Sequence, residues 1–535
     1  MKSFSQLYRA LDATTKTSQK IAAMVDYFQH ATPGDASWAV YFLNGNRLSR
    51  VLPPRVLRQW SYDRAGIPAW LFEESYQSVG DLAETISLLV PAGEAAIQQT
   101  LQQWVQDIQE FRGEDESRRV TLLDQLWQRI PQEDAFVLAK MITGGMRVGV
   151  SRRLVVRAIS EAFGLSTDQV AHRMMGQWEP TEEFFRMLID PDQDSDNHVR
   201  PYPFCLAQAV EQDPTHLGNP QDYLAEWKWD GIRLQLIRRQ GETLLWSRGE
   251  ERIEDRFPEI VAAATSLPEG TVIDGELLAW RGDQPLGFLE LQRRINRKKV
   301  GKKLMQDVPV RMLAFDVLES DGVDIRNQPL QSRRMILESL FDHPGADGKE
   351  LIQLSTLLEF GTWEELGKSR AEADAAHAEG VMIKSRQSAY LTGRVTGAWW
   401  KWKTEPSTID AVLIYAQRGH GRRASLYTDY TFALWEGEQL VPFAKAYSGL
   451  TDAEIRKVDR FIRDNTRERF GPVRSVEPEL VMELAFEKVQ ASKRHKSGVA
   501  VRFPRILRWR QDKTIQQANH LADLKEMAGL ETVDD

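Results

Sequence analysis

A lysine between two tryptophans is the residue of this chain whose surroundings most favour covalent chemistry. Lys228 stands in the string Glu226-Trp227-Lys228-Trp229-Asp230-Gly231, ahead of apolar alternation from Leu234 to Ile237. Alternation predicts a strand and the Asp-Gly step predicts a turn, so we expect Lys228 near the end of a strand. Flanking rings or a nearby cation favour the neutral amine, which is the nucleophilic form. Taken alone, the string also fits a surface lysine beside a hairpin turn.

Further short patterns follow Lys228, and each of them alone is weak. Asp-Gly-Glu usually forms a turn, and alternating Trp and Lys usually belongs to an edge strand with solvated lysines. The patterns in chain order are Ser247-Arg248-Gly249, Asp274-Gly275-Glu276, Phe315-Asp316, the segment from Glu379 to Lys384, Trp400-Lys401-Trp402-Lys403, and the basic segment from Arg502 to Lys513.

Together and in this order, the patterns resemble the nucleotidyltransferase motifs of the ATP-dependent DNA ligases. The resemblance extends over the whole chain, with residues 1–200 similar to a helical DNA-binding domain, 201–405 to an adenylation domain and 406–535 to an OB domain. It implies sealing of 5′-phosphate/3′-hydroxyl nicks in duplex DNA through a covalent lysine–AMP intermediate and adenylated DNA. The implied cofactors are ATP and Mg²⁺, with Mn²⁺ able to substitute.

The resemblance also implies residue roles. Lys228 would attack the α-phosphate of ATP, and Lys401 and Lys403, which alternate and so share one face of a strand, would contact that phosphate. Oxygen ligands beside phosphates suit Mg²⁺. The implied cofactor contacts are Glu226 at the adenine edge, Glu276 at the ribose, Phe315 stacked on adenine, Arg233 and Arg248 near phosphate, and Arg502, Arg505 and Arg508 at the β- and γ-phosphates; the implied metal ligands are Glu379 and Glu276.

Two basic segments are candidates for contact with DNA. The segment Thr143 to Arg153 places three glycines and three arginines before an apolar helix, with Ser151 as a candidate N-cap. It fits an ordinary helix-loop-helix turn and a phosphate clamp equally well, and the clamp would use Arg147, Ser151 and Arg152. Residues 293–303 are basic without an acidic residue among them. A solvated face is the usual explanation of such a run, but nucleotide chemistry in the same region favours backbone contact through Arg293 and Arg294.

Three other classes of protein share parts of this pattern. RNA ligases and capping guanylyltransferases share the lysine motif but lack a long helical N-terminal region and the Arg-Phe-Pro-Arg ending. NAD-dependent ligases usually carry a four-cysteine zinc site, which one cysteine, Cys205, excludes. A non-catalytic clamp on DNA ends would not need intact Lys228, Glu276, Glu379 and Lys401 together.

The composition predicts several domains in an ordinary globular protein. A chain of 535 residues is too long for one core, and its net charge of −8 does not itself indicate a nucleic-acid partner. The low cysteine content and the absence of an apolar leader or a long apolar run favour a cytoplasmic protein, nucleoid-associated if bacterial. We expect a monomer that acts on nicked double-stranded DNA without a membrane, and the sequence indicates no protein partner.

The periodicities predict the elements that would position these residues. Apolar residues recur at helical spacing to about residue 200, and residues 190–220 read as a linker. The predicted fold class is multidomain, with an all-α N-terminal domain, an α/β (α+β) middle domain and a β-barrel OB-fold C-terminal domain, and the resemblance implies that the middle domain is the nucleotidyltransferase domain. Thr451 and Glu454 predict a capping box for a helix that runs to about Phe470. The predicted strands are Leu234–Ile237, Val272–Ala279, Val310–Val317 and Gly380–Lys384 in the middle, then Ile409–Ala416, Ser425–Trp435, Leu440–Tyr447, Leu480–Phe486 and Val499–Phe503.

Overall fold

The structure, a computed structural model, describes residues 1–93, 97–191, 199–211, 213–341, 350–419, 425–492 and 494–530. The chain forms two compact units, and each is described by itself. The first unit contains residues 1–5, 47–146 and 405–535, and the second contains residues 6–46 and 147–404. No helix in the described ranges is long and apolar enough to cross a membrane.

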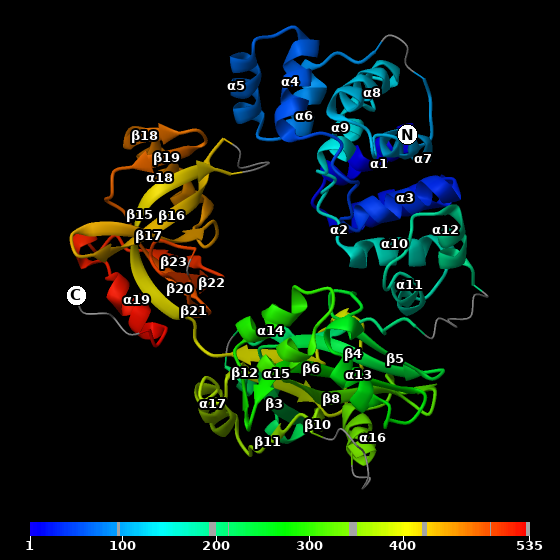
Figure 1. The fold of residues 1–535 in the computed structure, drawn as a ribbon, viewed down its shortest axis with the longest axis vertical. Coiled ribbons are helices and arrows are strands. Elements are labelled where there is room, and N and C mark those ends of the chain that lie inside the picture. Colours follow the sequence, from blue (N-terminus) through cyan, green and yellow to red (C-terminus); the bar gives the residue numbers. More distant parts are fainter. Residues whose placement is uncertain are drawn as a thin grey trace. The chain divides into compact units, whose positions relative to one another are not determined.

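The N-terminal residues are helical, as predicted (Figure 1). Side-chain caps begin several of these helices, including the capping boxes of Thr100 with Gln103 and Ser166 with Gln169. Gly66, Gly80, Gly144 and Gly164 end others in the left-handed conformation. The helices are α1 (Lys2–Asp12), α2 (Thr17–His30), α3 (Pro33–Leu43), α4 (Pro54–Ala65), α5 (Ala69–Val79), α6 (Leu82–Leu89), α7 (Leu101–Gln109), α8 (Glu116–Arg129), α9 (Ala135–Thr143), α10 (Arg152–Phe163), α11 (Thr167–Arg173) and α12 (Glu182–Ile189).

Two sheets form the middle of the chain. A seven-stranded sheet has the order β10-β8-β6-β4-β5, with β7 and β9 paired to β6 and β8, and a five-stranded sheet has the order β11-β3-β12-β14-β2. The strands are β3 (Tyr223–Trp229), β4 (Ile232–Arg239), β5 (Glu242–Ser247), β6 (Thr271–Arg281), β7 (Gln284–Pro285), β8 (Val310–Ser320), β9 (Val323–Asp324), β10 (Ile352–Leu354), β11 (Leu357–Leu358), β12 (Ala378–Ser385), β13 (Gly393–Arg394) and β14 (Trp399–Lys403). The helices are α13 (Pro258–Ala264), α14 (Phe288–Ile295), α15 (Lys302–Asp307), α16 (Leu330–Phe341) and α17 (Trp363–Ala371).

The expected linker at 190–220 is only partly a linker. Strand β1 (Cys205–Leu206) pairs with β13, and β2 (Gln208–Ala209) pairs with β14. Tyr202 and Cys205 are buried in a core with Trp399. The prediction was wrong here because proline and aspartate mark breaks in local structure, whereas two-residue strands depend on distant partners.

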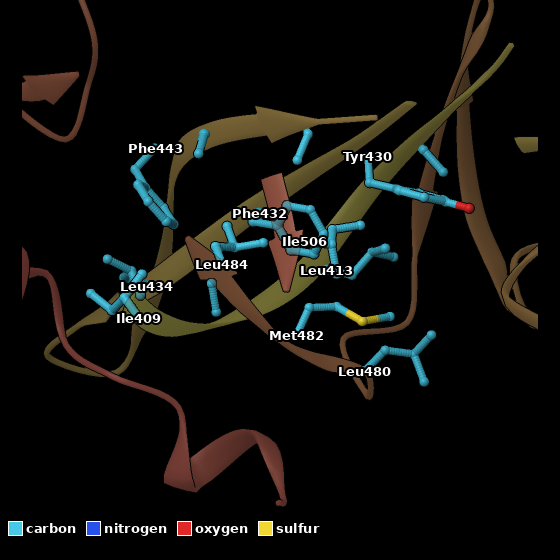
Figure 2. Packing of buried hydrophobic residues seen from close by; sticks show 14 of the residues in the cluster. Ile409, Leu413, Tyr430, Phe432, Leu434, Phe443, Leu480, Met482, Leu484 and Ile506 are labelled. Atoms are coloured by element: carbon cyan, nitrogen blue, oxygen red, sulfur yellow. The ribbon is translucent and has the colours of Figure 1, made fainter. Parts of the chain in front are cut away.

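The C-terminal residues form a sheet-rich region around a large hydrophobic core (Figure 2), and the predicted fold class is confirmed. All five predicted strands are present. The predicted end of the helix is wrong, because α18 (Asp452–Asp464) ends at Asp464 and a strand begins at Thr466. The strands are β15 (Ser407–Arg418), β16 (Tyr427–Glu436), β17 (Gln439–Ala446), β18 (Thr466–Phe470), β19 (Val473–Val476), β20 (Val481–Phe486), β21 (Lys488–Ala491), β22 (Val499–Arg502) and β23 (Arg505–Trp509), and the last helix is α19 (Leu521–Met527).

Candidate active site

A bulge in the five-stranded sheet faces Lys228. Where β3 pairs with β12, Trp229 lies opposite Ala378 and Trp227 lies opposite Val381, so Glu379 and Gly380 both face Lys228. A bulge of this kind redirects a side chain out of the regular alternation. Gly380 has φ +138°, and a Cβ there would lie 2.3 Å from the carbonyl oxygen of Trp402. Only glycine fits this position, and the close approach of β14 depends on it.

Three charged side chains meet at this bulge. The Lys228 ammonium donates a hydrogen bond to Glu379 Oε2, and Lys403 Nζ lies 3.3 Å from the same oxygen. Lys401 lies two residues before Lys403 on β14 and therefore points to the same face of the sheet. All three side chains of the cluster are largely but not completely buried. The ammonium group of the proposed nucleophile thus shares one carboxylate with a second ammonium group, and the net positive charge of this arrangement attracts phosphate oxygens.

A second bulge displaces Phe315 in the seven-stranded sheet. Asp274 pairs with Asp316 and Gly275 pairs with Ala314, which leaves Phe315 as the extra residue of β8. On the neighbouring strand, Glu276 pairs with Arg233 of β4. Burial raises the pKa of Glu276 to about 7, although Lys228 and Arg233 act in the opposite direction. The influence of Lys228 on this carboxyl group indicates that both sheets contribute to one site.

A buried ionic network lies against the Phe315 ring. Lys384 Nζ is 4.1 Å from the centre of that ring and donates a 2.5 Å hydrogen bond to Glu226 Oε2. Arg334 donates a 3.2 Å bond to Glu226 Oε1. Burial raises the pKa of Glu226, while Lys384 and Arg334 oppose that rise. Glu226 is only 3% exposed, and both oxygens of its carboxylate already accept hydrogen bonds. It therefore has less capacity to bind the adenine edge than the resemblance implied.

Neither Lys384 nor Arg334 was predicted as a site residue. Both lie more than 100 residues from Glu226 along the chain. In the sequence, Lys384 directly follows the apolar residues Val381-Met382-Ile383, which could have indicated that it is buried. A buried lysine needs an anionic partner.

Arg233 differs from its expected role. Its guanidinium donates to both oxygens of Asp274, at 3.1 and 2.7 Å, and to the carbonyl of Cys205 at 2.6 Å. Burial alone would lower its pKa, but Asp274 raises the pKa above its ordinary value. It also lies 5.4 Å from the centre of the Phe315 ring. Arg233 therefore supports the site from behind, whereas Arg248 is exposed and close enough to Glu276 to influence its pKa.

Of the two acidic residues expected to bind metal, Glu379 contacts Lys228, and Glu276 is close enough for Lys228 to influence its pKa. Among the described residues, no group of three or more His, Cys, Asp or Glu side chains could hold a metal ion. Mg²⁺ often binds through one or two carboxylates, with substrate phosphates and waters as the other ligands. Glu276 and Glu379 fit that requirement, and the raised pKa of Glu276 indicates a carboxylate that a cation would stabilise.

Comparisons with known proteins agree along most of the chain. Three family models match: "DNA ligase N terminus" over residues 1–174, "ATP dependent DNA ligase domain" over 205–403 and "ATP dependent DNA ligase C terminal region" over 423–513. A protein named "Probable DNA ligase" from Koribacter versatilis is 33% identical over 98% of this chain and 96% of its own length. The chain belongs to the ATP-dependent DNA ligase family. Its relatives are nucleotidyltransferases that form phosphodiester bonds.

More distant relatives extend the same similarity to this ligase. "DNA ligase 1" of Korarchaeum cryptofilum is 27% identical, and the alignment covers 98% of each chain. The solved structure named "Pmar-Lig_PreS3" covers 95% of this chain and 99% of its own, with a TM-score of 0.63 and 14% identity. That likeness shows a shared fold.

The predicted phosphate clamp of the ligase is tied to neighbouring residues. Lys20 of α2 donates to the carbonyls of Val148 and Gly149, at 2.5 and 3.1 Å, and so fixes the loop before α10. Ser151 occupies the N-cap position, but its side chain makes no capping bond. Arg152 forms an ion pair with Glu250 and donates to the carbonyl of Met174 at 2.5 Å. Arg147 is exposed.

The two arginines of α14 have different surroundings. Arg293 is exposed and paired with Glu290 at 2.5 Å. Arg294 is completely buried, and its guanidinium bonds both oxygens of Glu259 and the carbonyl of Val308. Arg294 therefore anchors α14 in the fold, and its burial leaves it unable to make the expected contact with DNA. The helical period accounts for the error, since adjacent residues of a helix face different directions.

The C-terminal basic segment of the ligase is organised by an aspartate. Asp410 of β15 accepts from Arg510 at 3.0 Å and from Lys513 at 2.5 Å. Arg508 pairs with Glu483 of β20 at 2.5 Å and remains well exposed. Arg502 and Arg505 are partly exposed, on β22 and at the start of β23.

Proposed function

We propose that this ligase seals nicks in duplex DNA through covalent AMP on Lys228. The observation that carries the proposal is the contact of both Lys228 and Lys403 with the same Glu379 oxygen at the bulge of β12. The ammonium group must lose a proton before it can attack, and Glu379 is the acceptor in contact with it. The Nζ–Pα bond then forms, the bond from Pα to the bridging oxygen breaks, and pyrophosphate leaves with its electron pair.

Two later steps complete the proposed reaction. A 5′-phosphate oxygen at the nick attacks the AMP phosphorus, and Lys228 leaves as the amine. The 3′-hydroxyl then attacks the activated 5′-phosphate and AMP departs. Lys401 and Lys403 would stabilise charge on the phosphate oxygens in these steps.

The other assignments follow the positions of the side chains. Phe315 would stack on adenine and Glu276 would bind the ribose, with Arg248 near phosphate. Mg²⁺ held by Glu379 and Glu276 would supply neutralisation of phosphate charge when bound. Arg502, Arg505 and Arg508 would hold the β- and γ-phosphates, and Arg147, Ser151, Arg152 and Arg293 would contact DNA, for which Arg152 must exchange Glu250 for phosphate. We retain three domains, at residues 1–200, 201–405 and 406–535.

The test is incubation with α-labelled ATP and Mg²⁺, followed by denaturing electrophoresis. The wild-type chain should keep the label, and Lys228→Ala should lose it. Lys368→Ala is the matched control, because Lys368 is an exposed lysine on α17 paired only with Glu364 among the contacts of the described residues. Full labelling of Lys228→Ala would refute the assignment, and preferential labelling from GTP would place the protein among capping enzymes.

A further inference from the structure

A small cleft with a basic rim lies among the helices of the first unit. It encloses about 170 Å³ between the loop that precedes α4 and the turn that joins α7 to α8. Val51, Ile108 and Phe111 form its apolar floor, and each of them is at most 4% exposed. Each of the two segments that form the walls of the cleft contains a buried core residue, Val51 in one and Ile108 and Phe111 in the other, so the packing of the core holds the walls in place.

Backbone and side-chain hydrogen bonds fix the shape of this cleft. The amide of Arg112 donates to the carbonyl of Gln109 at 3.1 Å, and Gly113 follows with φ +82°, which turns the chain toward α8. Arg119 then joins the two walls. It donates through Nε to the carbonyl of Glu114 at 2.8 Å and through Nη1 to the carbonyl of Val51 at 3.4 Å.

Positive charge gathers on the rim without a lining carboxylate. Arg50, Arg112 and Arg119 line the cleft together with Ser49 and Gln109, and none of the described residues that line it is acidic. Arg50 and Arg112 are exposed, and Arg119 is half-buried. Arginine donates from a planar fork that matches phosphate oxygens, and it is weakly hydrated for a cation. A ligand that suits this cleft combines an anion with a small apolar group.

We propose that the cleft of Arg50, Arg112 and Arg119 binds one backbone phosphate of the DNA duplex. The adjoining deoxyribose would lie against Val51, Ile108 and Phe111. This inference rests on the proposed function, which makes duplex DNA the substrate. Phosphate contacts fix the position of a protein on DNA without reading its sequence, as an enzyme that acts on nicks of any sequence requires.

The experiment measures binding of the full chain to a fluorescein-labelled nicked duplex, without ATP, over a series of salt concentrations. Arg50→Ala/Arg112→Ala should bind roughly tenfold more weakly at about 0.1 M salt, and its slope of log K against log salt should fall by about one, as for the loss of one phosphate contact. Arg50→Lys/Arg112→Lys should keep most of the slope. Arg119 is left unchanged because it joins the walls of the cleft.

The matched control is Arg118→Ala, which removes an exposed arginine of α8 that does not line the cleft. Wild-type affinity and slope in Arg50→Ala/Arg112→Ala would overturn the inference. An equal loss in Arg118→Ala would overturn it too, because the effect would then come from total charge. Labelling of the wild-type chain by ATP is scored separately, so a failure of the proposed function is distinguished from a failure of the cleft. Melting curves establish that each variant is folded.

Discussion

The buried network of Lys384, Glu226 and Arg334 gives the sharpest prediction about the fold of the site. Lys384→Met keeps an unbranched side chain against the rings of Phe315 and Trp399 but removes the ammonium group. Glu226 would then keep Arg334 alone in surroundings that leave it 3% exposed. Removal of one partner from a buried ion pair typically costs about 3–5 kcal/mol, because a buried charge is left uncompensated.

A surface pair provides the comparison. Lys368 lies 3.2 Å from Glu364 with side chains 69% and 82% exposed, so Lys368→Met should change the free energy of unfolding by less than about 1 kcal/mol. For a region of this size, each kcal/mol shifts the melting temperature by roughly 2–4 °C, so Lys384→Met should lower it by about 6–20 °C. Circular dichroism and calorimetry of the full chain measure both variants.

The pH dependence of Lys384→Met identifies the cause. Burial raises the pKa of Glu226, and the loss of Lys384 removes an opposing influence. The folded protein then binds the Glu226 proton more tightly than the unfolded chain does. The free energy of unfolding therefore falls as pH rises from the unfolded-state pKa of Glu226 to its folded-state pKa. The deficit of Lys384→Met should therefore be smaller at pH 5 than at pH 8, and Lys384→Met/Glu226→Gln should recover part of it. A deficit equal to that of Lys368→Met would refute the reasoning.

Three further predictions concern activity. Gly380→Ala should abolish lysine adenylation, whereas Gly287→Ala, where a Cβ meets nothing within 4 Å, should be labelled as the wild type is. Arg505→Ala should lose most ATP-dependent sealing but retain sealing of pre-adenylated DNA, whereas Lys401→Ala should impair both activities. If Arg505→Ala lost both activities equally at unchanged DNA affinity, the proposed contact of Arg505 with the β- and γ-phosphates would be refuted. If the ionised form of Glu276 binds the ribose, the ratio of wild-type to Glu276→Gln adenylation rates should rise roughly tenfold from pH 6 to pH 8, because its pKa is about 7; a constant ratio would contradict this role.

Local pattern was sufficient to predict the order of structural classes and most of the longer strands. Strand-like apolar runs placed β4, β6, β8 and β12. Thr451 and Glu454 correctly marked the start of α18, but its end at Asp464 was missed. No glycine or proline marks this end in the sequence. The helix ends there because the residues that follow form β18, which pairs with β19.

The site was harder to predict because it depends on register between distant strands. The string around Lys228 indicated a nucleophile, but Glu379 reaches it only through a bulge in a strand that begins 150 residues later. The resemblance implied a place near phosphate for Arg233, and the basic run suggested DNA contact for Arg294. Sequence alone does not reveal the carboxylates that hold them inside the fold.

The cluster at the bulge changes sign during the proposed reaction. Before ATP binds, the ammonium groups of Lys228 and Lys403 and the carboxylate of Glu379 carry one net positive charge. Attachment of AMP turns one ammonium into a neutral nitrogen and adds a phosphate anion, so the same group carries one net negative charge once Glu379 has released the proton it accepted. A site that draws in the first triphosphate would therefore repel a second until AMP has moved to DNA.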